Sequence, residues 1–277
     1  LAIWNAAVAG ERNRGAGMAD KIKRVLLLFW HMIWPLLLYE ATGTLVRSEL
    51  ALLFPEKEPE QLALPAMGVT AAAACVFLGK LYQEQCCSTQ SRGKRRKKDY
   101  FLLFAWSAAA GAGSCLLFNS LILSIPGLRA GAKEVSRLIY RPSLTVQLLC
   151  TGLVIPLAEE LLFRAVGYRN LRRELPVSGA AAVSALWFAL FHGNPVQGTY
   201  AFLTGLCLAL LFEWTDSLRA VWSFHAAANL VSLAATEMGE RIEAQAPRAF
   251  FLCLGAAGGM LLVGSFYRIK NKRGWKT

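Results

Sequence analysis

Residues 144–167 read LTVQLLCTGLVIPLAEELLFRAVG, a run long and apolar enough to cross a bilayer as one helix, apart from Glu159, Glu160 and Arg164. Similar apolar runs recur along the 277-residue chain, of which 55% is hydrophobic and only 17% is charged. A soluble domain carries about 25% charged residues, so this composition excludes a disordered chain and disfavours a soluble domain. The sequence predicts an all-α fold, a polytopic bundle of transmembrane helices.

The apolar runs predict about eight membrane helices. They cover residues 25–46, 64–82, 100–125, 144–167, 177–191, 199–214, 220–236 and 249–266. The fifth run is too short to cross about 30 Å of hydrocarbon alone, so we expect its helix to be buried among the others. Because repeats and low-complexity linkers are absent from the sequence, residues 19–277 are interpreted as one integral-membrane domain. Residues 1–18 are interpreted as a flexible leader or an annotation extension, since Met18 stands just before the first run.

The cations that give the chain its net charge of +12 are unevenly distributed along the sequence. Lys and Arg concentrate in the loops and tail on the N-terminal side of the expected bundle, above all in residues 92–98, whereas the loop after the first run is acidic. By the positive-inside rule, both termini are expected in the cytoplasm of a multi-pass membrane protein. The basic segments predict membrane lipids as partners, and no nucleic acid.

The two adjacent glutamates are the first candidate functional residues, since ionisable groups within a span are costly and are functional candidates by default. Glu160 and Arg164 are four residues apart, on one helix face, and are expected to pair. Glu159 points about 100° away from Glu160, so it is left without that cation and is the candidate general base. The alternative is a structural ion pair with Glu159 facing water.

Two of the chain's three histidines are candidates as well. His192 ends the short fifth run, and His225 precedes Asn229 by four residues, among alanines that allow helices to approach closely. At 1.5 Å per residue, Glu159 lies about 20 Å from the end of its helix near Arg172, and His192 lies about 23 Å into a helix that starts near Pro176. These two side chains therefore reach similar depths, whereas His225 is expected to be shallower, about 8–10 Å past Arg219.

Together these residues suit water activation. Glu159, helped by His192, would take a proton from water, and His225 with Asn229 would donate hydrogen bonds to the oxyanion that forms. The alternative uses His192, His225 and Glu159 as zinc ligands. Because the zinc motif HExxH is absent from the sequence, metal-free chemistry without a cofactor is favoured.

Three short motifs occur in order on separate apolar runs. They are EExxxR (Glu159, Glu160, Arg164), FxxxH (Phe188, His192) and HxxxN (His225, Asn229). Over residues 144–232 the chain therefore resembles the CAAX-protease and bacteriocin-processing (CPBP, ABI-type) family of glutamic intramembrane endopeptidases. The remaining runs match that family only in being apolar.

The resemblance implies helices around a central catalytic cavity, with Glu159 as base, His192 assisting, and His225 and Asn229 at the oxyanion. Glu160, Arg164 and Phe188 would support them. The expected function is hydrolysis of a peptide bond in a membrane-associated protein or peptide, of the CAAX type or the peptide- and bacteriocin-maturation type. The expected location is the cytoplasmic membrane of a prokaryote.

Three alternatives remain at this point: a non-proteolytic binding or immunity protein of the same fold, a zinc-dependent version of the protease, and a transporter whose Glu–Arg pair moves protons. The sequence does not indicate an oligomeric state.

Overall fold

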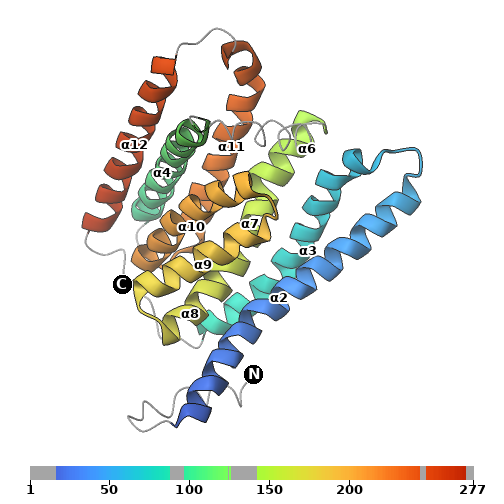
Figure 1. Cartoon of the computed structure of the whole chain (residues 1–277), viewed down its shortest axis with the longest axis vertical. Coiled ribbons are helices and arrows are strands. Elements are labelled where there is room, and N and C mark those ends of the chain that lie inside the picture. Colours follow the sequence, from blue (N-terminus) through green and yellow to red (C-terminus); the bar gives the residue numbers. More distant parts are fainter. Residues whose placement is uncertain (1–16, 88–96, 124, 126–141, 244–247, 273–277) are drawn as a thin grey trace.

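A computed structural model describes residues 17–87, 97–123, 125, 142–243 and 248–272, and every regular element in these residues is a helix (Figure 1). The all-α prediction is therefore confirmed. The elements are α2 (Met18–Leu53), α3 (Pro59–Cys87), α4 (Lys97–Leu123), α6 (Leu144–Leu149), η1 (Cys150–Val154), α7 (Ile155–Glu160), η2 (Leu161–Tyr168), α8 (Arg169–Glu174), α9 (Val177–Phe191), α10 (Pro195–Thr215), α11 (Leu218–Glu243) and α12 (Arg248–Asn271). The predicted leader and most of the basic cluster at residues 92–98 lie outside the described residues.

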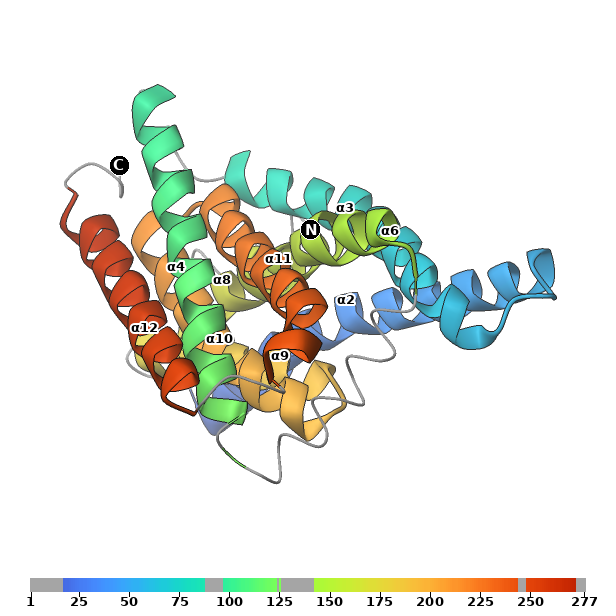
Figure 2. The same ribbon diagram turned by 90° about the horizontal axis from the view of Figure 1, so that it is seen from above.

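The helices form a bundle in which the segment from α6 to α8 lies between two groups of helices (Figures 1 and 2). On one side α4 packs between α11 and α12, and on the other α2 and α3 form a long hairpin. The start of α2 and the end of α12 lie at the same end of the bundle (Figure 1). At that end Lys272 Nζ contacts Asp99 Oδ1 at 2.7 Å, joining the end of α12 to the start of α4.

Six of the helical segments are long and apolar enough to cross a membrane: Ile22–Leu53, Pro59–Gln83, Lys98–Ile122, Leu144–Glu174, Pro195–Thr215 and Phe250–Asn271. The fifth predicted run forms α9, which at 15 residues covers only about 22 Å. The seventh forms α11, whose sequence includes Arg219, His225, Asn229 and several glutamates, so it is not among the six. All eight predicted segments are helical, but fewer than eight of them have the character of membrane spans.

The fourth segment is helical from Leu144 to Glu174, although two stretches, η1 and η2, have the wider π-helical turn. Pro156 explains the first, because proline donates no backbone hydrogen bond and its ring crowds the carbonyl four residues earlier. The Ile155 amide instead donates to Cys150 O, five residues back. A regular helix was the expectation, and π-turns inside α-helices are frequent at functional sites.

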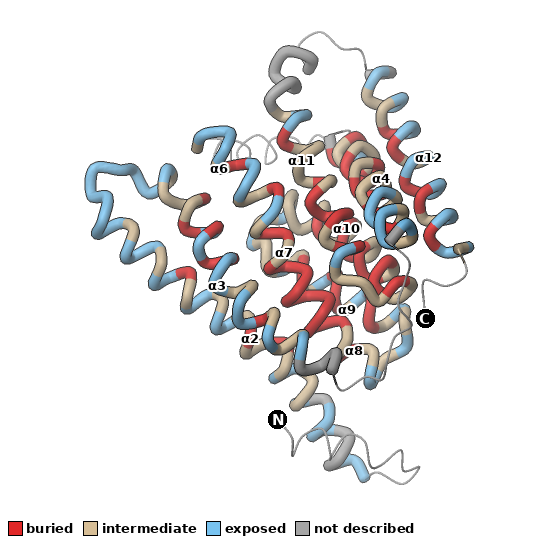
Figure 3. The backbone as a smooth tube through the Cα atoms, turned by 180° about the vertical axis from the view of Figure 1, so that it is seen from behind, coloured by how far each residue is buried: buried red, intermediate tan, exposed pale blue. Residues whose placement is uncertain are grey.

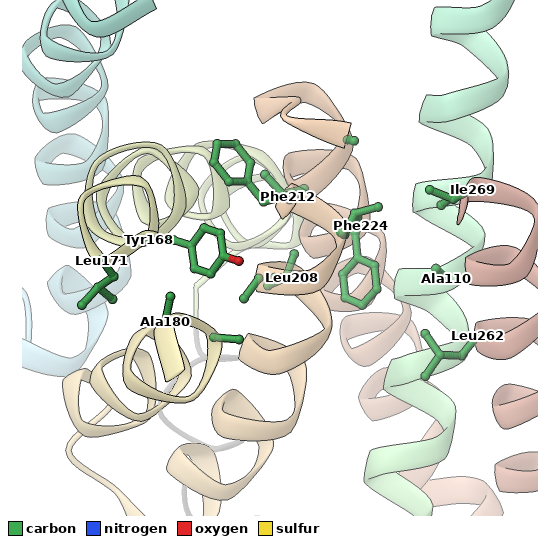
Figure 4. Packing of buried hydrophobic residues seen from close by; sticks show 14 of the residues in the cluster. Ala110, Tyr168, Leu171, Ala180, Leu208, Phe212, Phe224, Leu262 and Ile269 are labelled. Carbon is green, nitrogen blue, oxygen red and sulfur yellow. The ribbon is translucent and has the colours of Figure 1, made fainter. Parts of the chain in front are cut away.

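Buried side chains concentrate on α7, η2 and the inner faces of α4, α10 and α11, whereas α2 is largely exposed (Figure 3). The largest hydrophobic cluster joins Tyr168 of η2 and Phe212 of α10 to Phe224 of α11 (Figure 4). Leu262 and Ile269 of α12 also belong to this cluster. The exposed apolar residues of α2 match a helix that faces lipid.

Close backbone contact between α4 and α11 depends on Gly111. A Cβ built at Gly111 would overlap the carbonyl oxygen of Phe224, the residue before His225. α4 approaches α12 in the same way, since a Cβ at Gly113 would lie 2.6 Å from Gly258 O. Small residues that let helix backbones approach are typical of membrane bundles, and here they fix the height and rotation of α11.

We expect Gly111→Ala to destabilise the protein by about 1–3 kcal/mol, because the added methyl group must push α4 away from α11. Thermal unfolding in detergent measures this effect. Gly264→Ala in α12 is the matched control, since no atom lies within 4 Å of the Cβ that it adds. Equal melting temperatures for the two variants would contradict the proposed contact.

Candidate active site

Glu160 and Arg164 form a fully buried ion pair. Arg164 Nη1 lies 3.0 Å from Glu160 Oε1, and neither side chain has any exposed surface. Arg164 also donates from Nη2 to Gly205 O at 3.4 Å, and its guanidinium lies 4.4 Å from the centre of the Phe188 ring. The pair predicted from the four-residue spacing is therefore present, with α9 and α10 supplying further contacts to the cation.

His225 brings α11 to both glutamates. Its Nδ1 lies 2.8 Å from Glu160 Oε1, and its Nε2 lies 3.6 Å from Glu159 Oε2. The expectation that His225 would lie shallower than the glutamates is wrong, because rise per residue measures distance only along a helix's own axis. α11 packs across η1 and α7 and so delivers His225 to their level.

The two glutamates differ in what surrounds them. Oε1 of Glu160 receives both the Arg164 guanidinium and the His225 Nδ1–H, and its side chain is 0% exposed. The Glu159 side chain retains 10% exposure, and its 3.6 Å separation from His225 Nε2 exceeds hydrogen-bonding distance. Glu159 is thus the less tightly held of the two carboxylates, and its role as a base stays a prediction.

Phe188 connects the remaining histidine to this group. His192 ends α9, where its Nδ1–H donates to Phe188 O at 2.8 Å, which leaves Nε2 as the nitrogen with a free lone pair. The Phe188 ring meets both histidine rings edge-on, with centroid distances of 4.8 Å to His192 and 5.7 Å to His225. Among the described residues no hydrogen bond or ion pair joins His192 to Glu159 directly.

The side chain of Asn229 contacts the backbone of η1. Its Nδ2 donates to Thr151 O of η1 at 2.9 Å. One of its two amide hydrogens is therefore engaged in holding α11 against η1. The role at an oxyanion, which needs a donor aimed at the reacting carbonyl, stays a prediction.

Trp222 is a positioning residue that the sequence reasoning missed. Its Nε1–H donates to Leu153 O of η1 at 3.0 Å. Trp222, His225 and Asn229 are spaced by three and four residues, so they share one face of α11, and that spacing was the available signal. The hydrogen bonds of Trp222 and Asn229 to the carbonyls of η1 thus lie on either side of His225 along α11.

Tyr39 of α2 is a second residue without a sequence signal. Its ring lies 5.8 Å from that of Phe191, the residue before His192, and it packs against the cluster that contains Ile155 and Ala158. It therefore contacts the surroundings of both Glu159 and His192. Only the packing of α2 against the centre of the bundle brings it there.

The zinc alternative needs His192, His225 and Glu159 to converge. Across the part of the chain that the structure describes, no group of three His, Cys, Asp or Glu side chains is arranged to hold a metal ion. Within the described residues His192, His225 and Glu159 are thus not arranged as three ligands of one zinc ion.

The central cavity implied by the family resemblance coincides with neither of two hollows in the described residues. One of these is lined by Met32, Leu162, Phe163, Gly167, Ser184 and Trp187. The other lies between α2 and α8. Neither is lined by the glutamates or histidines of the three motifs.

Comparison with known proteins locates this site in a recognised family region. Residues 141–231, about a third of the chain, match the family model described as type II CAAX prenyl endopeptidase Rce1-like. The match contains all three motifs, so the resemblance inferred from them is confirmed for this region. No curated protein and no solved structure matches the chain.

We expect Trp222→Phe to lower the free energy of unfolding by about 1 kcal/mol, because it removes the hydrogen bond to Leu153 O and keeps an aromatic ring beside Phe104. Equilibrium unfolding in mixed micelles measures the change. Trp34→Phe is the matched control, since the Trp34 ring packs against Phe77 and its N–H makes no hydrogen bond within the described residues. Equal losses in both variants would show that the Leu153 bond contributes nothing.

Proposed function

We propose that the chain is an intramembrane endopeptidase in which Glu159 activates water to hydrolyse a peptide bond of a membrane-associated protein or peptide. The observation that carries the proposal is the unequal setting of two adjacent carboxylates. Glu160 is paired with Arg164 and His225, whereas the Glu159 side chain keeps 10% exposure and lies 3.6 Å from Nε2 of the same histidine. The match to a prenyl endopeptidase family model supports this class of reaction.

In the proposed reaction Glu159 takes a proton from water while the water oxygen bonds to the carbonyl carbon. The carbonyl oxygen becomes an oxyanion, which hydrogen-bond donors fixed in a low-dielectric site stabilise. The second amide hydrogen of Asn229 is one proposed donor. His225 is the other, in the form that carries a hydrogen on Nε2 as well as on Nδ1, and His192 assists proton transfer. When the carbon–nitrogen bond breaks, the proton held by Glu159 passes to the amine that leaves.

Glu160 and Arg164 have the proposed role of fixing His225. A carboxylate that accepts the Nδ1–H of a histidine fixes the orientation of its ring, so that Nε2 faces Glu159. Arg164 balances the charge of Glu160, which would be costly to bury alone. Phe188 packs against the guanidinium and both imidazole rings.

We also propose that the end of the bundle that carries the first residues of α2 and the last of α12 faces the cytoplasm. Ion pairs of Arg169 with Asp216 and of Arg172 with Glu213 join α8 to α10 near this end. Arg268 and Lys270 lie in the last turn of α12. The turn between α2 and α3 at the other end is mainly acidic, so the charge difference follows the positive-inside rule.

We expect Glu159→Gln to lower cleavage by at least about a hundredfold, because it removes the base. We expect the melting temperature to stay unchanged, because Gln has the same shape and Glu159 makes no contact with a charged group shorter than 3.6 Å within the described residues. Mass spectrometry of peptides from the reconstituted protein measures cleavage, using a farnesylated CAAX peptide and its unprenylated counterpart. Full cleavage by Glu159→Gln would overturn the proposal. If cells that carry Glu159→Gln behave like cells that carry the unaltered protein, the binding or immunity protein is favoured instead.

Glu160→Gln should act differently from its neighbour. It leaves the Arg164 charge buried without a carboxylate, so we expect a loss of stability of about 3 kcal/mol. Thermal unfolding of the two variants side by side separates a base from a structural partner. If Glu160→Gln were as stable as Glu159→Gln, the assignment of roles within the pair would be wrong.

Chelation tests the metal-free chemistry. We expect 1,10-phenanthroline or EDTA to leave the cleavage rate unchanged, because the proposed reaction uses only Glu159, His192, His225 and Asn229. Loss of cleavage that added Zn²⁺ restores would establish the zinc-dependent alternative. A dilution control with buffer alone corrects for detergent effects.

A further inference from the structure

Tyr39 of α2 contacts the surroundings of two residues of the proposed mechanism, Glu159 and His192. Its ring meets the ring of Phe191, the residue before His192, edge-on at a centroid distance of 5.8 Å. Tyr39 also packs against the cluster that contains Ile155, which lies one helical turn before Glu159. It therefore connects two motif residues between which the described part of the chain forms no hydrogen bond or ion pair.

The hydroxyl of Tyr39 lies in the electrostatic field of the candidate base. Besides burial, the strongest influence on this hydroxyl is the charge of Glu159, ahead of that of Glu40, its neighbour in the sequence. The interaction between two charged or polar groups weakens with distance and with exposure to water. The packing of α2 has thus placed a phenol group from one end of the chain beside a carboxylate on α7.

The same hydroxyl is available for a further hydrogen bond. Within the described residues it forms none, and it is not one of the fully buried polar atoms either, so a water molecule or a substrate group can reach it. The O–H of a tyrosine whose ring is packed in a protein usually has a partner. A hydroxyl without one, next to a candidate base, indicates a hydrogen bond to a molecule that enters the site.

The chemistry of hydrolysis requires such a group. A water molecule that attacks a carbonyl carbon must be oriented as well as deprotonated, because a lone pair of its oxygen has to face that carbon. Glu159 accounts for one of the two water hydrogens, and the second needs an acceptor of its own. A tyrosine oxygen accepts hydrogen bonds while its own O–H stays protonated at neutral pH.

We propose that Tyr39 is a further catalytic residue of the hydrolysis proposed above, on which this inference rests: its hydroxyl oxygen accepts the second hydrogen of the water that Glu159 activates. Glu159 takes the first hydrogen as the water oxygen bonds to the carbonyl carbon. The second hydrogen stays on that oxygen and leaves with the carboxylic acid product. No covalent bond of Tyr39 forms or breaks, so its contribution is the orientation of water between α2 and α7.

Tyr39→Phe tests the hydroxyl, since it keeps the ring that packs against Phe191. We expect kcat to fall about five- to tenfold, the value of one hydrogen bond, while KM and the melting temperature stay unchanged. Steady-state kinetics of the reconstituted full chain, on whichever of the two CAAX peptides the unaltered protein cleaves, measures both constants. Tyr267→Phe is the matched control, since Tyr267 of α12 is 67% exposed, and we expect it to change neither constant.

The outcomes separate this inference from the function on which it rests. If the unaltered protein cleaves and Glu159→Gln does not, but Tyr39→Phe keeps the full kcat, the inference is wrong and the proposed hydrolysis stands. A higher KM or a lower melting temperature with an unchanged kcat would assign Tyr39 to binding or packing, which also overturns the inference. If the unaltered protein fails to cleave, or Glu159→Gln cleaves fully, the proposed function itself fails, and this inference fails with it.

A measurement that does not depend on cleavage tests the closeness of the two side chains. With meta-fluorotyrosine incorporated at position 39, we expect Glu159→Gln to shift the fluorine NMR resonance of that residue. The resonance of the same label at position 267 is expected to stay in place, because Tyr267 lies on α12 and is exposed. An unshifted resonance at position 39 would overturn the placement of this hydroxyl beside Glu159.

Discussion

The buried Glu160 carboxylate is the group on which the centre of this molecule depends. Removing a carboxylate from water is so costly that it needs both a cation and hydrogen bonds, and Oε1 receives Arg164 and His225 together. Arg164 in turn engages Gly205 of α10 and Phe188 of α9. One charge therefore fixes the relative positions of α7, η2, α9, α10 and α11.

The π-helical turns and α11 depend on each other. In the wider turn of η1, just before Pro156, two backbone carbonyls accept hydrogen bonds from α11. Asn229 donates to Thr151 O, and Trp222 donates to Leu153 O. On the opposite side of α11, Gly111 lets the backbone of α4 pack directly against the Phe224 carbonyl. His225 is thus held from two directions, and a helix too polar to be a membrane span on its own has a defined place inside the bundle.

Much of this arrangement followed from residue spacing. The four-residue spacing of Glu160 and Arg164 predicted their ion pair. The prediction that residues 177–191 form a buried helix holds for one face of α9 only, since Leu186 and Leu190 on the other are 52% and 65% exposed. The depth of His225 was wrong because rise per residue carries no information about how helices cross. Trp222 and Tyr39 were missed since a lone aromatic residue in an apolar run looks like ordinary packing.

The sequence by itself determined the helical membrane class, the three motifs and the distinction between a paired and an unpaired glutamate. These are properties of composition and of neighbours along one helix, which local geometry governs. Tertiary structure decided which carboxylate His225 binds and which carbonyls Asn229 and Trp222 hold. Those contacts join residues tens of positions apart or more, so only the packing of whole helices, fixed by buried charge and small residues, could determine them.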